Sequence, residues 1–117
     1  METFDVSFNN KGKYYVYILL SLKDNGLYIG FTSNLKTRLT QHAKGQATAT
    51  RLRIPFLLIH YEYFIDKADA KAREEYLKSG AGRTQLKQIL KRTFEKYLKT
   101  ASGFAASNAA SPFAINA

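Results

Sequence analysis

The chain has 117 residues, enough for one domain with a single hydrophobic core and too few for two. It carries 18 Lys and Arg residues against 9 Asp and Glu residues, a net charge of +9, and it has no cysteine. This composition excludes a disulfide framework and a thiolate zinc site, and it favours binding of a polyanion, either nucleic acid or an anionic membrane. With two histidines, a metal would depend on carboxylates and would be a hard ion such as Mg²⁺.

No membrane-inserted segment is visible in the sequence. No stretch reaches the roughly 18 apolar residues of a membrane span, and the polar start of the chain lacks the apolar core of a signal peptide. The basic residues are dispersed, without the long amphipathic basic helix of a membrane-surface protein. We therefore expect a soluble, cytoplasmic protein without membrane contact.

Two strands joined by a tight turn open the expected domain. Residues 14–20 are β-branched, aromatic or aliphatic, residues 27–32 repeat this composition, and Asn25-Gly26 between them is a strong hairpin signal. We predict an antiparallel pair.

One face of this hairpin is phenolic. If the hairpin loop has an even number of residues, directly paired positions sum to an odd number, and Tyr17 then shares a face with Tyr28 and Gly30. The glycine leaves space beside the phenols. The strand propensity of tyrosine is the alternative explanation for their presence.

A short amphipathic helix is expected next. Ser33 or Asn34 can cap it, and Gly45 lies at its stop position. Arg38 and His42 lie one turn apart, beside an apolar stripe of Leu35, Leu39 and Ala43. An arginine there can bind a phosphate with two N–H donors, and a histidine can move a proton, although a solvated basic face is the simpler interpretation.

The second half of the domain has one strand and two helices. The sequence predicts a strand over residues 56–64, a helix over residues 67–79 capped by Asp66, and a helix over residues 83–98. The segment SGAG, residues 79–82, is interpreted as the stop between the two helices.

The expected order is ββαβαα, a three-stranded antiparallel sheet flanked by helices in an α+β domain of residues 14–98. Residues 1–13 have no clear period and are expected to be a flexible lead-in. Residues 99–117 are rich in Ala, Ser and Asn and are expected to be a flexible tail.

The second helix supplies acidic groups, Asp69, Glu74 and Glu75. Periodicity leaves open which of the two glutamates faces a site. One inward carboxylate would suffice for Mg²⁺ in phosphodiester chemistry, because substrate phosphates and water complete the coordination. The residues alone thus indicate a nucleic-acid binder with the parts of a nuclease.

At this point the chain resembles the GIY-YIG nucleases, a family named for two tripeptides about ten residues apart. Here the tripeptides are Tyr15-Val16-Tyr17, in which Tyr15 replaces the glycine, and Tyr28-Ile29-Gly30, which matches in full. Arg38 follows ten residues after Tyr28, and His42 one turn later, where the family has an arginine and a histidine or tyrosine.

The resemblance continues in the stretch ADAKAREEYLKSGAGR and covers about residues 14–90. In small family members the metal-binding glutamate comes four residues after an Ala and four before a Lys. Ala70 and Lys78 therefore select Glu74 over Glu75. The chain looks most like the stand-alone bacterial members, which have a single domain.

The resemblance implies a divalent-metal-dependent endonuclease that hydrolyses phosphodiester bonds in DNA, in repair or recombination. Tyr17, with Tyr28, would position or deprotonate the attacking water, and Arg38 would stabilise charge on the phosphoryl oxygens. Glu74 would hold one Mg²⁺ or Mn²⁺, and His42 would assist proton transfer or hold a tyrosine in place. The glycine of the second tripeptide would keep the floor of the site open to DNA.

Four further basic residues are candidates for contact with flanking phosphates: Arg51, Arg53, Lys78 and Arg83. Solubilising charge is an equal alternative for them. The competing hypothesis for the whole chain is a nucleic-acid binding module that keeps the nuclease fold without useful turnover. No oligomeric state is predicted.

Overall fold

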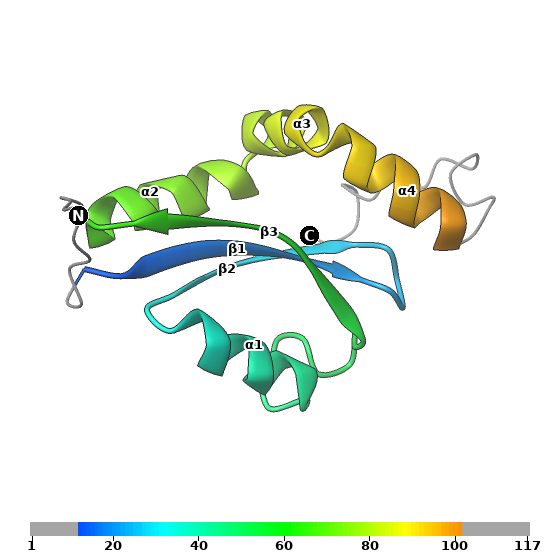
Figure 1. Ribbon diagram of the computed structural model, residues 1–117, viewed down its shortest axis with the longest axis horizontal. Helices are drawn as coiled ribbons and strands as arrows, with labels where there is room; N and C mark the ends of the chain where they lie inside the picture. Colours follow the sequence, from blue (N-terminus) through cyan, green and yellow to red (C-terminus); the bar gives the residue numbers. More distant parts are fainter. Residues whose placement is uncertain (1–11, 102–117) are drawn as a thin grey trace, which may run out of the picture.

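The computed structural model describes residues 12–101, with side chains up to residue 98. Three strands form one antiparallel sheet in the order β2-β1-β3, and four helices lie against it (Figure 1). This confirms the predicted α+β class and its three-stranded antiparallel sheet. The elements are β1 (Tyr14–Ser21), β2 (Leu27–Thr32), α1 (Leu35–Ala43), β3 (Phe56–Phe64), α2 (Lys67–Lys78), α3 (Gly80–Ile89) and α4 (Lys91–Ala101).

The predicted lead-in and tail fall mostly on residues 1–11 and 102–117, which lie outside the described residues. Within the described part of the chain, no helix is long and apolar enough to cross a membrane.

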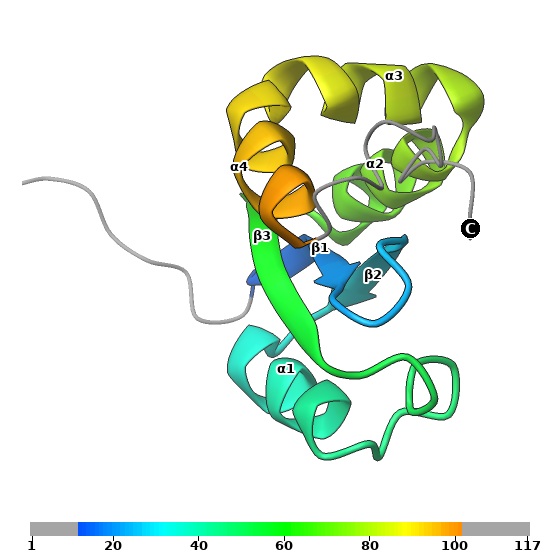
Figure 2. The same ribbon diagram turned by 90° about the vertical axis from the view of Figure 1, so that its right-hand side faces the viewer.

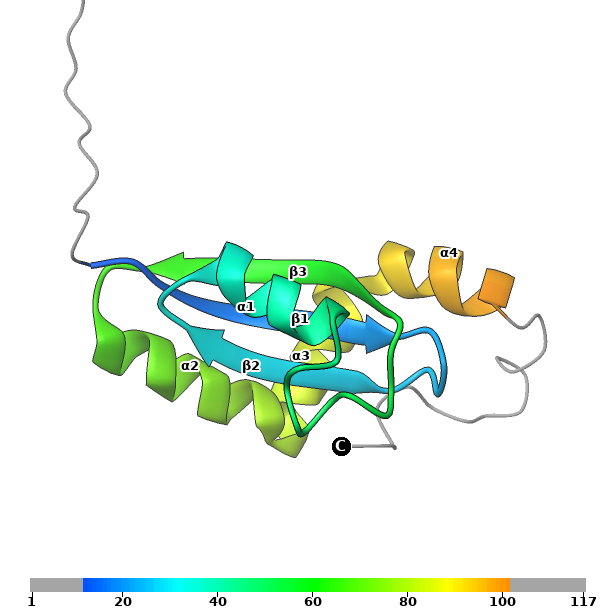
Figure 3. The same ribbon diagram turned by 90° about the horizontal axis from the view of Figure 1, so that it is seen from below.

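The two faces of the sheet are covered by different helices, and one of them carries the hydrophobic core. Helix α1 lies on one face, and α2, α3 and α4 lie on the other (Figures 1 and 2). Seen from below, α1 crosses over the sheet while α2 and α3 lie on its far side (Figure 3). The α2 side holds the hydrophobic core, whose buried members are Val16, Ile18, Leu20, Leu27, Ile29, Ala70, Leu77, Leu86, Leu90 and Phe94.

The register of the hairpin decides which residues reach each face. Tyr17 pairs with Gly30 and Leu19 pairs with Tyr28, so paired positions sum to an odd number as expected. In the turn, Asn25 has φ 62°, a left-handed conformation that asparagine tolerates, and Ser21 N donates to Gly26 O at 2.9 Å. The phenolic face therefore points toward α1, opposite the hydrophobic core.

The first two helices begin and end as their sequences predict. Asn34 caps α1, since its side chain accepts a hydrogen bond from Thr37 N at 3.1 Å. Gly45 follows the helix with φ 75°, a conformation that glycine adopts without strain. Asp66 caps α2 by accepting from Ala68 N at 2.7 Å.

The prediction of a single third helix over residues 83–98 was wrong. Helix α3 begins at Gly80, because Ser79 caps it by accepting from Gly82 N at 3.1 Å, so SGAG starts a helix as well as ending one. The helical path breaks at Leu90, with φ −112° and ψ 24°, and α4 continues beyond residue 98. Leu90, at the break, and Phe94 both belong to the core.

Candidate active site

Tyr17 lies at the centre of the face toward α1, with only 1% of its surface exposed. Its phenol ring passes directly over Gly30, its partner in β2. A Cβ atom at this glycine would overlap the phenol, with the ring's Cε1 at 2.8 Å. Glycine is therefore required for this tyrosine to occupy its position.

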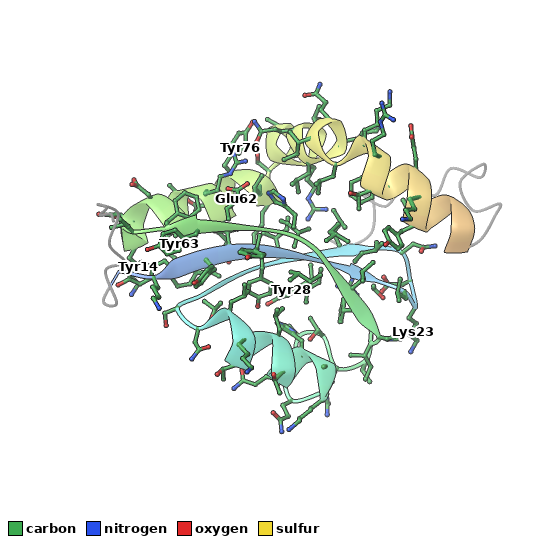
Figure 4. The ribbon with its side chains drawn as sticks, viewed as in Figure 1. Tyr14, Lys23, Tyr28, Glu62, Tyr63 and Tyr76 are labelled. Atoms are coloured by element: carbon green, nitrogen blue, oxygen red, sulfur yellow. The ribbon has the colours of Figure 1, made fainter. Side chains whose placement is uncertain are left out.

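His42 extends from α1 to meet this phenol and is also 1% exposed. Its Nε2 lies 2.8 Å from Tyr17 Oη, and its Nδ1 lies 2.7 Å from Thr50 Oγ1. The ring of Tyr28 stands edge-on to the imidazole with centroids 5.1 Å apart, and this tyrosine points from β2 toward α1 (Figure 4). The histidine is thus held at both ring nitrogens and does not lie on a solvated helix face.

Burial is the main determinant of the protonation states of the Tyr17 hydroxyl and the His42 imidazole. It raises the pKa of Tyr17 to about 12, an effect that Arg38 opposes and that Tyr28 and Glu74 reinforce. Burial, with a smaller contribution from Arg38, lowers the pKa of His42 to about 4. At neutral pH the phenol therefore keeps its proton and the imidazole is neutral.

Arg38 is the cation of this cluster. Its contact with Tyr17 raises its pKa, and Tyr28 acts in the same direction, so the guanidinium faces both phenols. Its Nη1 also donates to Gln41 Oε1 at 2.8 Å, which limits its movement. A planar guanidinium held in this way has further N–H donors for a phosphate.

Glu74 and Glu75, which periodicity left open, occupy different environments. The Glu74 side chain is only 13% exposed, whereas Glu75 is exposed to solvent. The carboxylate of Glu74 accepts hydrogen bonds from Lys71 Nζ at 3.1 Å and from Lys78 Nζ at 3.0 Å. The charge of Glu74 also contributes to raising the pKa of the Tyr17 phenol.

The orientation of α2, and with it of Glu74, is fixed from β3. Arg73 donates to both carboxylate oxygens of Glu62, through Nε at 2.8 Å and Nη2 at 3.0 Å, and His60 adds a contact at 3.0 Å. Although burial opposes it, these contacts lower the pKa of Glu62. Glu62 points from β3 toward α2 (Figure 4).

A divalent metal has one carboxylate here. Among the residues that the structure describes, no group of three or more His, Cys, Asp or Glu side chains could hold a metal. Glu74 would be the one protein ligand of a hard cation that keeps most of its waters, since its carboxylate offers oxygen ligands. The ammonium groups of Lys71 and Lys78 now pair with this carboxylate, so a metal ion would have to displace them.

The four basic candidates for phosphate contact lie in different environments. Arg53 binds Asp24 through Nε at 2.7 Å, and so ties the loop before β3 to the hairpin turn. Lys78 pairs with the metal-candidate carboxylate, and Arg83 is partly buried, which lowers its pKa. Arg51 is exposed.

Thr50 is a member of the cluster that the sequence did not indicate. It is fully buried and contacts the imidazole of His42. It lies in residues 46–55, which have no hydrophobic period, and nothing in the pattern distinguishes it from Thr48 two residues earlier. Only the folded loop brings it to the site.

The fold, a three-stranded antiparallel sheet whose hairpin carries Tyr17 and Tyr28 and is followed by a helix with Arg38, is the one expected of a GIY-YIG catalytic domain. The profile of that domain matches residues 13–88, and the chain belongs to the GIY-YIG family.

Within this family, the chain is similar to small proteins named UPF0213. It is 40% identical to one from Staphylococcus haemolyticus over 81 residues, which is 68% of this chain and 98% of that protein. It is 39% identical to one from Clostridium perfringens, over 70% of this chain and 88% of the relative. A UPF0213 protein from Bacillus halodurans, solved by solution NMR, has 36% identity and a TM-score of 0.44, covering 66% of this chain and 84% of that one.

Proposed function

We propose that the protein is a divalent-metal-dependent endonuclease that hydrolyses phosphodiester bonds in DNA. The observation that carries this proposal is the convergence on one phenol. Arg38 from α1 interacts with the phenol of Tyr17 of β1 and lowers its pKa, whereas the negative charge of Glu74 on α2 raises the pKa of the same phenol. Simple phosphate binding needs neither a buried phenol nor a carboxylate.

Arg38 has the role of stabilising charge on the phosphoryl group. Its guanidinium is held by Gln41 and the phenols before substrate arrives, so little reorganisation is needed. A donor fixed in this way contributes about 3 to 4 kcal/mol to lowering the barrier. This contribution is lost if the fork is replaced by a single ammonium.

Glu74 would hold Mg²⁺ or Mn²⁺ through its carboxylate oxygens. When bound, such an ion supplies positive charge that stabilises the phosphate oxygens and lowers the pKa of nearby water. Lys71 and Lys78, which now neutralise the carboxylate, then become available to the phosphate backbone.

Tyr17 has the role of orienting the attacking water. Its phenol is protonated at rest, and the pKa values of about 12 for Tyr17 and about 4 for His42 oppose transfer of that proton to the ring. The phenol oxygen still has lone pairs that can accept a hydrogen bond from water. Positive charge from Arg38 lowers the pKa of the phenol, so added positive charge moves Tyr17 toward acting as a base.

The surface around the cluster suits a nucleic acid. The net charge of +9 favours a polyanion, and Arg51, which is exposed, would contact a flanking phosphate. On the face of Tyr17, the ring of Tyr15 lies 6.0 Å from that of Tyr61 and 5.6 Å from that of Tyr63, and Tyr61 is 51% exposed. Exposed rings beside a basic site favour contact with bases and sugars. We place this activity in the cytoplasm, in DNA repair or recombination.

The test is a cleavage panel with matched carboxylate variants. Wild type, Glu74→Gln and Glu75→Gln are incubated with supercoiled and branched DNA, with Mg²⁺, with Mn²⁺ and with a chelator. We expect metal-dependent cleavage by wild type and Glu75→Gln, and loss of roughly 100-fold or more in Glu74→Gln. Equal cleavage by Glu74→Gln, or no cleavage of any substrate, would refute the proposal.

The second candidate is a nucleic-acid binding module without turnover. It is favoured by the resting state of the site, in which the phenol is protonated and two lysines cover Glu74. Salt-sensitive DNA binding that is the same in wild type and Glu74→Gln, with no cleavage by either, would select it.

A further inference from the structure

The imidazole of His42 lies between two hydroxyl groups. Tyr17 Oη contacts Nε2 at 2.8 Å, and Thr50 Oγ1 contacts Nδ1 at 2.7 Å. Because the neutral ring carries one proton, it donates at one nitrogen and accepts at the other. If the ring donates its proton to Thr50, the hydroxyl of Tyr17 donates to Nε2; if the ring donates to Tyr17, the phenol proton must point elsewhere.

The surroundings of Tyr17 favour one of the two arrangements. Two described groups act on its oxygen through hydrogen bonding, His42 and Arg38. A guanidinium can only donate. The buried phenol proton therefore has Nε2 as its acceptor, and the ring proton must then lie on Nδ1 and be donated to Thr50.

We propose that Thr50 is a positioning residue that holds His42 in the tautomer with its proton on Nδ1, so that Nε2 accepts the hydrogen bond from Tyr17. The value of this arrangement for catalysis rests on the proposed nuclease function, whereas the tautomer itself does not. With its proton directed to Nε2, the phenol turns its lone pairs toward Arg38 and away from the imidazole.

Thr50 is held firmly enough to do this. Its own N–H donates to Ala47 O at 3.1 Å, and its C=O accepts from Arg53 N at 2.9 Å. The loop is in turn fixed to the hairpin turn, because Arg53 O accepts from Ser21 Oγ at 2.7 Å and Arg53 binds Asp24. The hairpin turn thus positions the threonine, which positions the histidine, which orients the phenol.

The experiment reads the tautomer directly by nitrogen-15 NMR of the imidazole rings. The chain has two histidines, so His60, on the far face beside Glu62, is an internal reference. In the wild-type protein we expect the proton of His42 on Nδ1 and a cross-peak connecting Nε2 to the phenol. A wild-type proton on Nε2 would overturn the proposal without any variant.

Two variants separate positioning from packing. Thr50→Val keeps the shape and removes the acceptor, and Thr50→Ser restores it. We expect Thr50→Val to move the ring proton to Nε2 or to mix the tautomers, and to lower kcat about 10- to 100-fold with little change in KM, while Thr50→Ser behaves as wild type. If Thr50→Val keeps the wild-type tautomer, the proposal is wrong, including when its cleavage falls.

The result is distinct from that of the nuclease test. If wild type cleaves no substrate, the proposed function fails, yet the NMR spectrum of the wild-type protein still decides the tautomer. If wild type cleaves but carries its His42 proton on Nε2, the nuclease function stands and the role of Thr50 falls.

Discussion

Burial of a neutral histidine in the site makes stability depend on pH. His42 is 1% exposed and contacts Tyr17, Tyr28 and Thr50. Arg38 lowers its pKa further, and within residues 12–98 no carboxylate is found to compensate a positive charge on the ring. Replacement by Gln removes the titrating group. Its amide keeps the ability to donate to one hydroxyl and accept from the other.

The magnitude follows from the pKa of about 4 in the folded protein against the ordinary value of 6.5. The unfolded chain binds a proton at higher pH than the native one, so this contribution to stability is complete above the unfolded pKa and is lost as pH falls toward the folded one. Between about pH 7 and about pH 4.5 the wild type should lose roughly 2.5 kcal/mol of unfolding free energy through His42.

Urea unfolding at a series of pH values measures this loss. We expect the stability difference between wild type and His42→Gln to shift by roughly 2.5 kcal/mol over that interval. Comparing the two proteins at each pH cancels the titration of carboxylates such as Asp24 and Glu62, and His60→Gln controls for the removal of any histidine. Parallel pH profiles for wild type and His42→Gln would show that the ring is hydrated or charged in the native state, and the assigned burial would be wrong.

Three further experiments test other parts of the molecule. Gly30→Ala should destabilise the fold by about 1 to 3 kcal/mol in thermal unfolding and reduce cleavage, because the added Cβ would overlap the phenol of Tyr17. The control Gly80→Ala, whose Cβ meets nothing within 4 Å, should leave stability unchanged or raise it. Arg38→Lys should lower kcat about 100-fold while DNA binding in a filter assay changes little; equal losses in both would mean that the arginine serves binding alone. Arg53→Ala should lower the melting temperature because it releases the loop, whereas Arg51→Ala should leave it unchanged and reduce the salt dependence of DNA binding. The reverse pattern for the last pair would show that the phosphate contact belongs to the ion-paired arginine.

The hairpin and the first two helices could be predicted because their determinants are local. The Asn25-Gly26 turn fixes the register, alternation then assigns faces, and single side chains such as Asn34 and Asp66 cap the helices. Periodicity alone does not separate Glu74 from Glu75; in the fold, Glu74 is the one that shares a helix face with the buried Ala70 and Leu77.

What could not be predicted depends on contacts between distant segments. The stretch SGAG both ends α2 and begins α3. Helix α3 can begin here because Gly82, lacking Cβ, packs against the backbone of Tyr76 and Leu77 at the end of α2. Thr50 and Arg53 lie in a segment without period, and their partners are the histidine of α1 and the hairpin turn. No local pattern records such pairings.

The division of β1 between two faces has a consequence for how this protein tolerates sequence change. Val16, Ile18 and Leu20 belong to the core on the α2 side, while the alternating Tyr17 and Leu19 lie on the α1 side. Folding free energy and chemistry are therefore encoded at alternate positions of one strand. Substitutions confined to the α1 side can retune the reaction without weakening the core, but an insertion or deletion of one residue in β1 exchanges the two sets and destroys both at once.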